Sequence, residues 1–115
     1  MSAYGPALFV SRRDRAELSE EEQARVFELV RAACLSVGVT GDDGEPAKPS
    51  IYGYDQEEQR ALGVLLYSSY AYVQMPDEIR EDHEEGWRRV GARVAAEIEK
   101  QSPGVYAFAS YGVEN

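Results

Sequence analysis

The sequence predicts a single α+β domain. Apolar segments rich in β-formers lie near both ends of the chain, longer amphipathic segments lie between them, and a length of 115 residues suits one domain. We expect about three helices packed on a short sheet that the N- and C-terminal strands form together. The hydrophobic share of 43% and the charged share of 29% are typical of globular rather than disordered chains. Residues 1–115 are therefore expected to form one globular domain.

The first strand and the first helix have clear local signals. Residues 7–12 (ALFVSR) are short, apolar and rich in β-formers, which predicts a strand. A helix is predicted over residues 18–38, because Ser19 and Glu22 have the spacing of a capping box and Gly38 can end the helix. One apolar stripe recurs at helical spacing: Val26, Phe27, Val30, Ala33, Cys34 and Val37. The glycines and prolines of residues 39–50 then indicate a loop.

Residues 55–73 carry conflicting signals. Asp55 and Glu58 repeat the spacing of a capping box, and the first half of the segment is rich in helix formers. The second half is rich in tyrosine and valine, which fit a strand. We predict a helix to about residue 72, with a strand as the alternative. Residues 51–54 (IYGY) could add a third strand to the sheet.

The third predicted helix covers residues 76–104. Its apolar positions recur every three or four residues and so lie on one face: Ile79, His83, Trp87, Val90, Val94 and Ile98. Glu84 with Arg88 and Glu85 with Arg89 are favourable pairs four residues apart. The turn formers at residues 102–104 end the helix, and residues 105–112 (VYAFASYG) are predicted to be a strand.

The composition argues against several classes of protein. The net charge of −9, from 21 acidic and 12 basic side chains, disfavours nucleic acid as a partner, since backbone binding needs a clustered positive surface. No apolar run approaches the roughly 20 residues of a membrane-spanning helix, and the first residues lack the pattern of a signal peptide. A single cysteine, Cys34, allows no intramolecular disulfide. We therefore expect a cytoplasmic protein that binds no membrane.

The usual catalytic and cofactor motifs are missing from the sequence. It contains no glycine-rich phosphate loop, no G-x-S-x-G elbow, and only one histidine, His83, so it cannot form H-E-x-x-H. The acids of residues 42–45 lack the spacing of an EF-hand loop. Cys34 lies within the first apolar stripe, which predicts a buried side chain rather than a reactive thiolate. We expect no metal and no cofactor.

Tyrosine is the unusual residue of this chain, with eight copies against three phenylalanines. Its ring packs while its hydroxyl meets water or a partner, so it suits the margin of a core and also protein interfaces. The leading hypothesis is a small acidic protein-binding module without catalysis: an inhibitor, an immunity-like or antitoxin-like protein, or an accessory subunit. Its partner would be a protein, with a basic protein and a second copy of this chain as the candidates. The candidate binding residues are Tyr52, Tyr54, Tyr67, Tyr70, Tyr72, Glu84 and Glu85.

The alternative hypothesis is a small cofactor-independent enzyme or small-molecule binder with a tyrosine-lined pocket. In it His83 would act as the acid or base, with Tyr70 beside it. Tyr67 and Tyr106 would supply further polar groups. The packing interpretation of His83 is favoured, because it falls on the apolar face of its helix one turn before Trp87.

Overall fold

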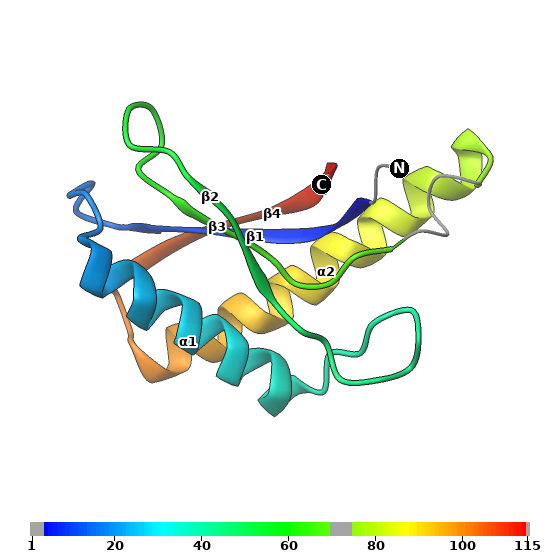
Figure 1. Ribbon diagram of the computed structural model, residues 1–115, viewed down its shortest axis with the longest axis horizontal. Coiled ribbons are helices and arrows are strands. Elements are labelled where there is room, and N and C mark those ends of the chain that lie inside the picture. The colour runs from blue at the N-terminus through cyan, green and yellow to red at the C-terminus, as the bar shows by residue number, and fades with distance from the viewer. Residues whose placement is uncertain (1–3, 70–74, 115) are drawn as a thin grey trace.

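The chain folds into six elements in the order β-α-β-β-α-β. The computed structural model describes residues 4–69 and 75–114 (Figure 1). The elements are β1 (Tyr4–Arg12), α1 (Glu20–Val37), β2 (Ser50–Tyr54), β3 (Leu62–Leu65), α2 (Asp77–Gln101) and β4 (Tyr106–Glu114). The strands form one antiparallel sheet in the order β2-β3-β1-β4. This is the split β-α-β topology, also known as ferredoxin-like, and it confirms the predicted α+β class.

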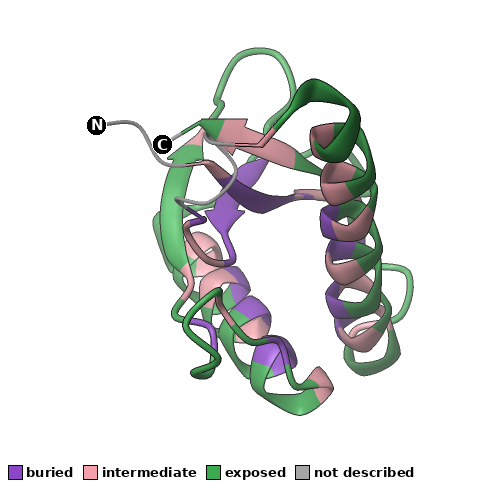
Figure 2. Cartoon of the chain, turned by 90° about the vertical axis from the view of Figure 1, so that its right-hand side faces the viewer, coloured by how far each residue is buried: buried purple, intermediate pink, exposed green. Residues whose placement is uncertain are grey.

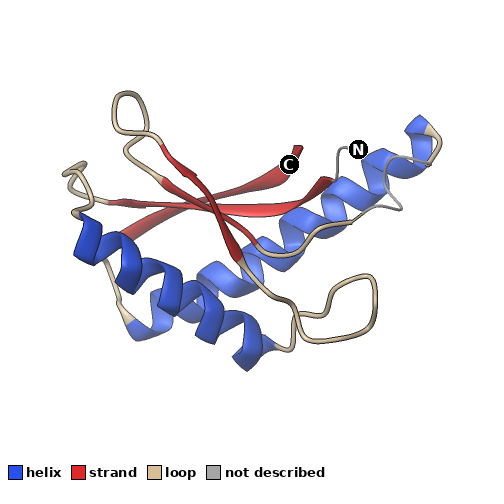
Figure 3. Cartoon of the chain, viewed as in Figure 1, coloured by secondary structure: helices blue, strands red, loops and turns tan. Residues whose placement is uncertain are grey.

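Both helices pack against the same face of the sheet (Figure 3). The buried residues lie on the inward sides of the helices and on the central strands (Figure 2). Alternate residues of each strand point to the helices, among them Leu8 and Val10 of β1 and Val64 of β3. Across the core they meet Val26 and Val30 of α1, and Val94 and Ile98 of α2. The opposite face of the sheet is left without a helix.

The two terminal strands pair with each other, but they do not form the sheet by themselves as predicted. β1 runs antiparallel to β4 along its whole length, with Leu8 opposite Ser110 and Val10 opposite Phe108. The sheet is nevertheless larger than predicted, because β3 pairs with the other edge of β1, and β2 pairs with β3. The suggested strand at residues 51–54 is therefore present, as β2.

The first helix forms as its sequence predicts. The Ser19 hydroxyl accepts a hydrogen bond from the Glu22 backbone N–H at 3.1 Å, and Gly38 ends the helix in the left-handed region at φ 74°. The capping box is only half formed, because the Glu22 carboxylate accepts a hydrogen bond from Arg12 of β1 instead.

The predicted helix that starts at residue 55 is wrong over the described residues 55–69. Its first turn does form: Asp55 Oδ1 accepts hydrogen bonds from the N–H groups of Glu57 at 3.0 Å and Glu58 at 3.1 Å. Arg60 then adopts a positive φ of 50°, which ends the turn, and residues 62–65 form the buried strand β3. β3 is an interior strand of the sheet and all four of its residues are buried, with Gly63 lying under the Phe9 and Tyr52 rings. Its sequence therefore lacks the alternation of apolar and polar residues that marks a strand. The described residues thus contain two helices rather than three. Tyr70 and Tyr72 lie outside the described residues.

The second observed helix, α2, matches the predicted apolar face over most of its length. Trp87, Val94 and Ile98 are buried, whereas Ile79 is 53% exposed. The first turns of α2 project past the ends of the strands (Figure 1), which explains the exposure of Ile79. Within the part of the chain that the structure describes, neither helix has the length and hydropathy needed to cross a membrane.

Candidate functional site

The uncovered face of the sheet carries no charged side chain from any of its four strands, all of which are described. The pairing register and the contact between Phe9 and Tyr52 identify the residues on this face. They are Gly5, Ala7, Phe9 and Ser11 of β1, Ser50, Tyr52 and Gly53 of β2, Gly63 and Leu65 of β3, and Ala107, Ala109, Tyr111 and Val113 of β4. An uncharged face this broad is unusual in a chain with 33 charged residues at neutral pH, of which 21 are acidic and 12 basic.

Three aromatic rings meet at the centre of this face, and we name Phe9, Tyr52 and Tyr111 the aromatic cluster. The Phe9 ring centroid lies 6.0 Å from that of Tyr52, at an interplanar angle of 81°, and 4.9 Å from that of Tyr111, at 35°. Phe9 is half-buried, while Tyr52 is 45% exposed and Tyr111 37% exposed. The two tyrosines are thus partly open to solvent.

A glycine beneath the aromatic cluster lets the rings lie close to the sheet. A Cβ on Gly63 would come within 2.8 Å of the Phe9 ring and 3.3 Å of the Tyr52 ring. Any larger residue at position 63 would lift both rings. The spacing of the aromatic cluster therefore depends on the sequence of the buried strand β3.

The aromatic cluster lines a shallow hollow of about 400 Å³ at the β2 side of the sheet. The hollow is bordered by Phe9, Tyr52, Gly53, Tyr54, Asp55, Gln59, Ala61 and Tyr111. Asp55 is the one charged residue of this set, and the N–H groups of Glu58 and Glu57 lower the pKa of its carboxyl. The site therefore combines aromatic surface with a single carboxylate that is ionised at neutral pH.

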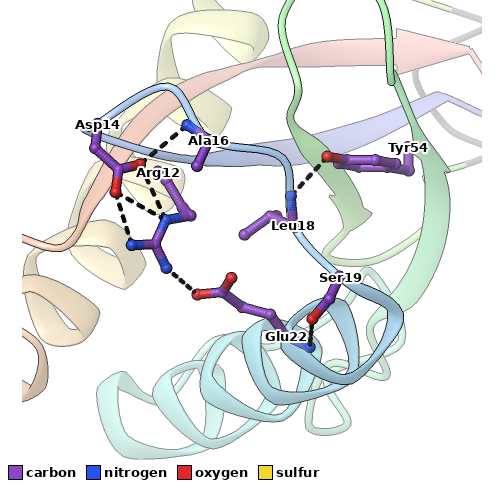
Figure 4. A network of polar contacts seen from close by, with 7 residues as sticks. All are labelled: Arg12, Asp14, Ala16, Leu18, Ser19, Glu22 and Tyr54. Carbon is purple, nitrogen blue, oxygen red and sulfur yellow. Dashed lines mark hydrogen bonds and ion pairs between the residues drawn. The ribbon is translucent and has the colours of Figure 1, made fainter.

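A network of polar contacts, which we name the clasp, joins the ends of β1 and β2 to the start of α1 (Figure 4). Arg12, at the end of β1, donates hydrogen bonds to Asp14 at 2.7 Å and to Glu22 of α1 at 2.8 Å. The guanidinium and the Ala16 N–H lower the pKa of Asp14 to about 2, and the two carboxylates raise the pKa of Arg12. Because Asp14 is exposed, we expect this ion pair to order the segment after β1 and to add little to the free energy of unfolding.

Tyr54, a candidate binding residue, is part of this clasp. Its hydroxyl accepts a hydrogen bond from the Leu18 N–H at 2.8 Å, and its ring packs against the core. The contact joins the end of β2 to the segment that enters α1 (Figure 4). Tyr54 therefore holds the wall of the hollow in place.

The substitution Tyr54→Phe should lower the free energy of unfolding by about 0.5–2 kcal/mol, because the buried Leu18 N–H loses its acceptor. Tyr52→Phe is the matched control two residues away. No hydrogen bond of the Tyr52 hydroxyl is found among the described residues, so its effect should stay within about 0.5 kcal/mol. Urea denaturation of both variants measures the difference. Equal effects would show that the Tyr54 hydroxyl has no such role.

The structure divides the candidate tyrosines among different parts of the molecule. Tyr52 lies on the uncovered face, whereas Tyr67 is half-buried against the core, where burial and the Asp42 carboxylate raise its pKa. Tyr106 is buried in the core. Tyr70 and Tyr72 lie outside the described residues, so their role stays a prediction.

The two candidate acids lie on α2, away from the aromatic cluster. Glu85 is exposed and lies 3.9 Å from Arg89, so one of the two predicted pairs is observed. Glu84 is half-buried near Gly112 of β4. Because α2 packs on the covered face, these acids and Tyr52 do not form one continuous surface (Figure 3).

Reasoning from the sequence missed Phe9, Tyr111 and Asp55 as site residues. One signal was available: in residues 105–112, Tyr106 and Phe108 share one face of the strand, so Tyr111 must lie on the other. Phe9 and Asp55 were missed because a helix was predicted over residues 55–72. With that helix, β3 and its Gly63 are not part of the sheet, so nothing indicates a site there.

Cys34 and His83, the side chains that could act as a nucleophile and as an acid or base, both pack against other residues. Cys34 is buried as predicted, and burial raises the pKa of its thiol to about 11. His83 contacts Trp87 edge-on, with ring centroids 4.8 Å apart. Among residues 4–69 and 75–114, no group of three metal-binding side chains is found.

Comparison of the chain with protein-family models, with curated proteins and with solved structures gave no significant match.

Proposed function

We propose that the protein is a small binding module, without catalysis, that docks a partner protein on the uncovered face of its sheet. One observation supports this best: a broad uncharged face that exposes the aromatic cluster. Exposed apolar patches with aromatic residues are typical of protein interaction sites. The proposal keeps the candidate Tyr52 and adds Phe9 and Tyr111 to the binding residues.

The size of the face suits a protein partner. The strands are nine, five, four and nine residues long, so at about 3.3 Å per residue and 4.8 Å between strands the sheet spans on the order of 400 Å². The exposed part is smaller, because Ala7 and Leu65 are only 0% and 2% exposed. That area is sufficient for a small or transient complex. Arg12, Arg13, Arg15 and Arg60 line a hollow with Ser11 and Ala107 at one end of this face. The chain as a whole nevertheless carries a net charge of −9, so a protein is favoured over nucleic acid.

We place the module in the cytoplasm, as an inhibitor, an immunity-like or antitoxin-like protein, or an accessory subunit. Its acidic charge would speed encounter with a basic partner. The alternative enzyme hypothesis rests on His83 and Tyr70. The contact of His83 with Trp87 adds no support to it, and Tyr70 lies outside the described residues.

Site-specific photo-crosslinking tests the docking surface. A benzophenone amino acid at Ala109, on the uncovered face, should trap one protein in the source cell, whereas the same group at Leu35, exposed on α1, should not. The trapped protein is then purified and its dissociation constant is measured. Tyr52→Ser combined with Tyr111→Ser should weaken binding by about tenfold or more, as expected for interface aromatics.

Identical adducts from Ala109 and Leu35, or an unchanged dissociation constant in the double variant, would contradict the proposed function. A crosslink between two copies of this chain would identify the partner as a homodimer on the same face, and the double variant would then have to become monomeric.

A further inference from the structure

We infer that the hollow beside the aromatic cluster receives an arginine side chain of the partner protein. The inference rests on the proposed function and specifies the chemistry of its partner. The hollow of about 400 Å³ is larger than a guanidinium group, so it leaves space for the aliphatic stem as well.

The aromatic rings would contact the face of the guanidinium group. The Tyr52 and Phe9 rings stand nearly perpendicular, at 81°, and the Tyr111 ring closes the cluster from β4. All three rings line the same hollow. A cation over the face of an aromatic ring is attracted by the ring quadrupole, and arginine is the cation most often found there.

Asp55 would form an ion pair with the guanidinium group. Its Oδ1 atom accepts two backbone hydrogen bonds, which hold the carboxylate at the rim of the hollow. Among the described residues no lysine or arginine forms an ion pair with Asp55. The Asp55 carboxylate is therefore available to form an ion pair with a cation of the partner.

The chain's own nearby arginines do not fill the hollow. Arg60 Nη1 donates a hydrogen bond to the Arg15 carbonyl at 2.6 Å, and both residues line a neighbouring hollow instead. Lysine is less suited to the site than arginine, because its ammonium is more strongly hydrated and cannot stack as a plane. The net charge of −9 favours approach of a basic segment.

Titration of the ¹⁵N-labelled protein with N-acetyl-arginine amide, followed by heteronuclear NMR, tests the inference. We expect saturable shifts at residues 9, 52–55 and 111, with an affinity in the millimolar range. N-acetyl-citrulline amide, which keeps the shape and lacks the charge, should bind at least about threefold more weakly. Equal binding of the two probes, or no localised shifts with arginine, would overturn the inference.

Two variants separate the contributions of ring and charge. Tyr52→Leu should weaken binding of the arginine probe by about three- to fivefold, with Ile51→Leu on the other side of the strand as its unchanged control. Asp55→Asn retains the acceptor Oδ1 and removes the charge, so it should also weaken binding, whereas the exposed Asp82→Asn of α2 should not. Equal affinities in all four variants would overturn the inference.

The two proposals can fail separately. If the arginine probe does not bind but Tyr52→Ser with Tyr111→Ser still weakens the crosslinked partner, the docking face stands and the arginine assignment is wrong. If neither effect is seen, both proposals are wrong.

Discussion

Replacing Gly91 by alanine should destabilise the protein by about 2–3 kcal/mol, although alanine is the better helix former. Gly91 lies where α2 crosses β4, and a Cβ at this position would come within 1.9 Å of Ser110 Oγ and 2.6 Å of Ser110 Cβ. Helix and strand would have to separate, which would open the contact between α2 and the sheet. Urea denaturation followed by circular dichroism measures the change.

Gly86 provides the control for this substitution within the same helix. A Cβ on Gly86 would meet only the Arg89 guanidinium, at 3.8 Å, so Gly86→Ala should stabilise the protein by about 0.5–1 kcal/mol. Adding Ser110→Gly to Gly91→Ala should restore part of the loss, because the nearest Ser110 atom left is its Cα, at 3.8 Å. If Gly91→Ala is as stable as Gly86→Ala, helix and sheet do not approach so closely.

Leu62→Ala should lower the free energy of unfolding by about 2–5 kcal/mol, the usual cost of removing a buried leucine. Leu62 is 0% exposed on β3, where it pairs with Val10 of β1 and Tyr54 of β2. The cavity would therefore open beneath both neighbouring strands. Chemical denaturation, with the slope against denaturant compared between variants, shows whether the loss is one of stability alone.

Leu35→Ala is the matched control, since Leu35 is 56% exposed on α1. Its effect should stay within about 0.5 kcal/mol. Similar losses in the two variants would contradict the position of β3 in the interior of the sheet. A loss confined to Leu62→Ala supports the burial of Leu62 in the core.

The candidate site depends on residues that lie far apart in the chain. Phe9, Tyr52 and Tyr111 come from β1, β2 and β4, and Gly63 of β3 lies beneath two of their rings. No single segment of the sequence contains a recognisable binding motif, so no local pattern predicts the aromatic cluster. The surplus of tyrosine suggested a binding surface in general terms, and Tyr52 is the predicted residue that lies on the uncovered face.

Local patterns in the sequence determined the elements whose signals are complete within one segment. The Ser19 cap, the apolar stripe through Val30 and the Gly38 terminus specify α1, because each of these contacts joins residues within about one turn of the helix. The same holds for α2 from Trp87 onward and for the two terminal strands. The α+β class follows from these elements.

Only the tertiary structure decided the state of residues 55–69. The Asp55 turn forms as the local signal predicts, yet the next residues become a strand because β1 and β2 offer hydrogen bonds on both sides of β3. All four residues of β3 are buried, so its sequence shows no alternation that would have marked the strand. Tertiary structure also left one face of the sheet without a helix, since α1 and α2 both pack on the other. The uncharged residues of that face become a candidate binding surface only when the four strands come together.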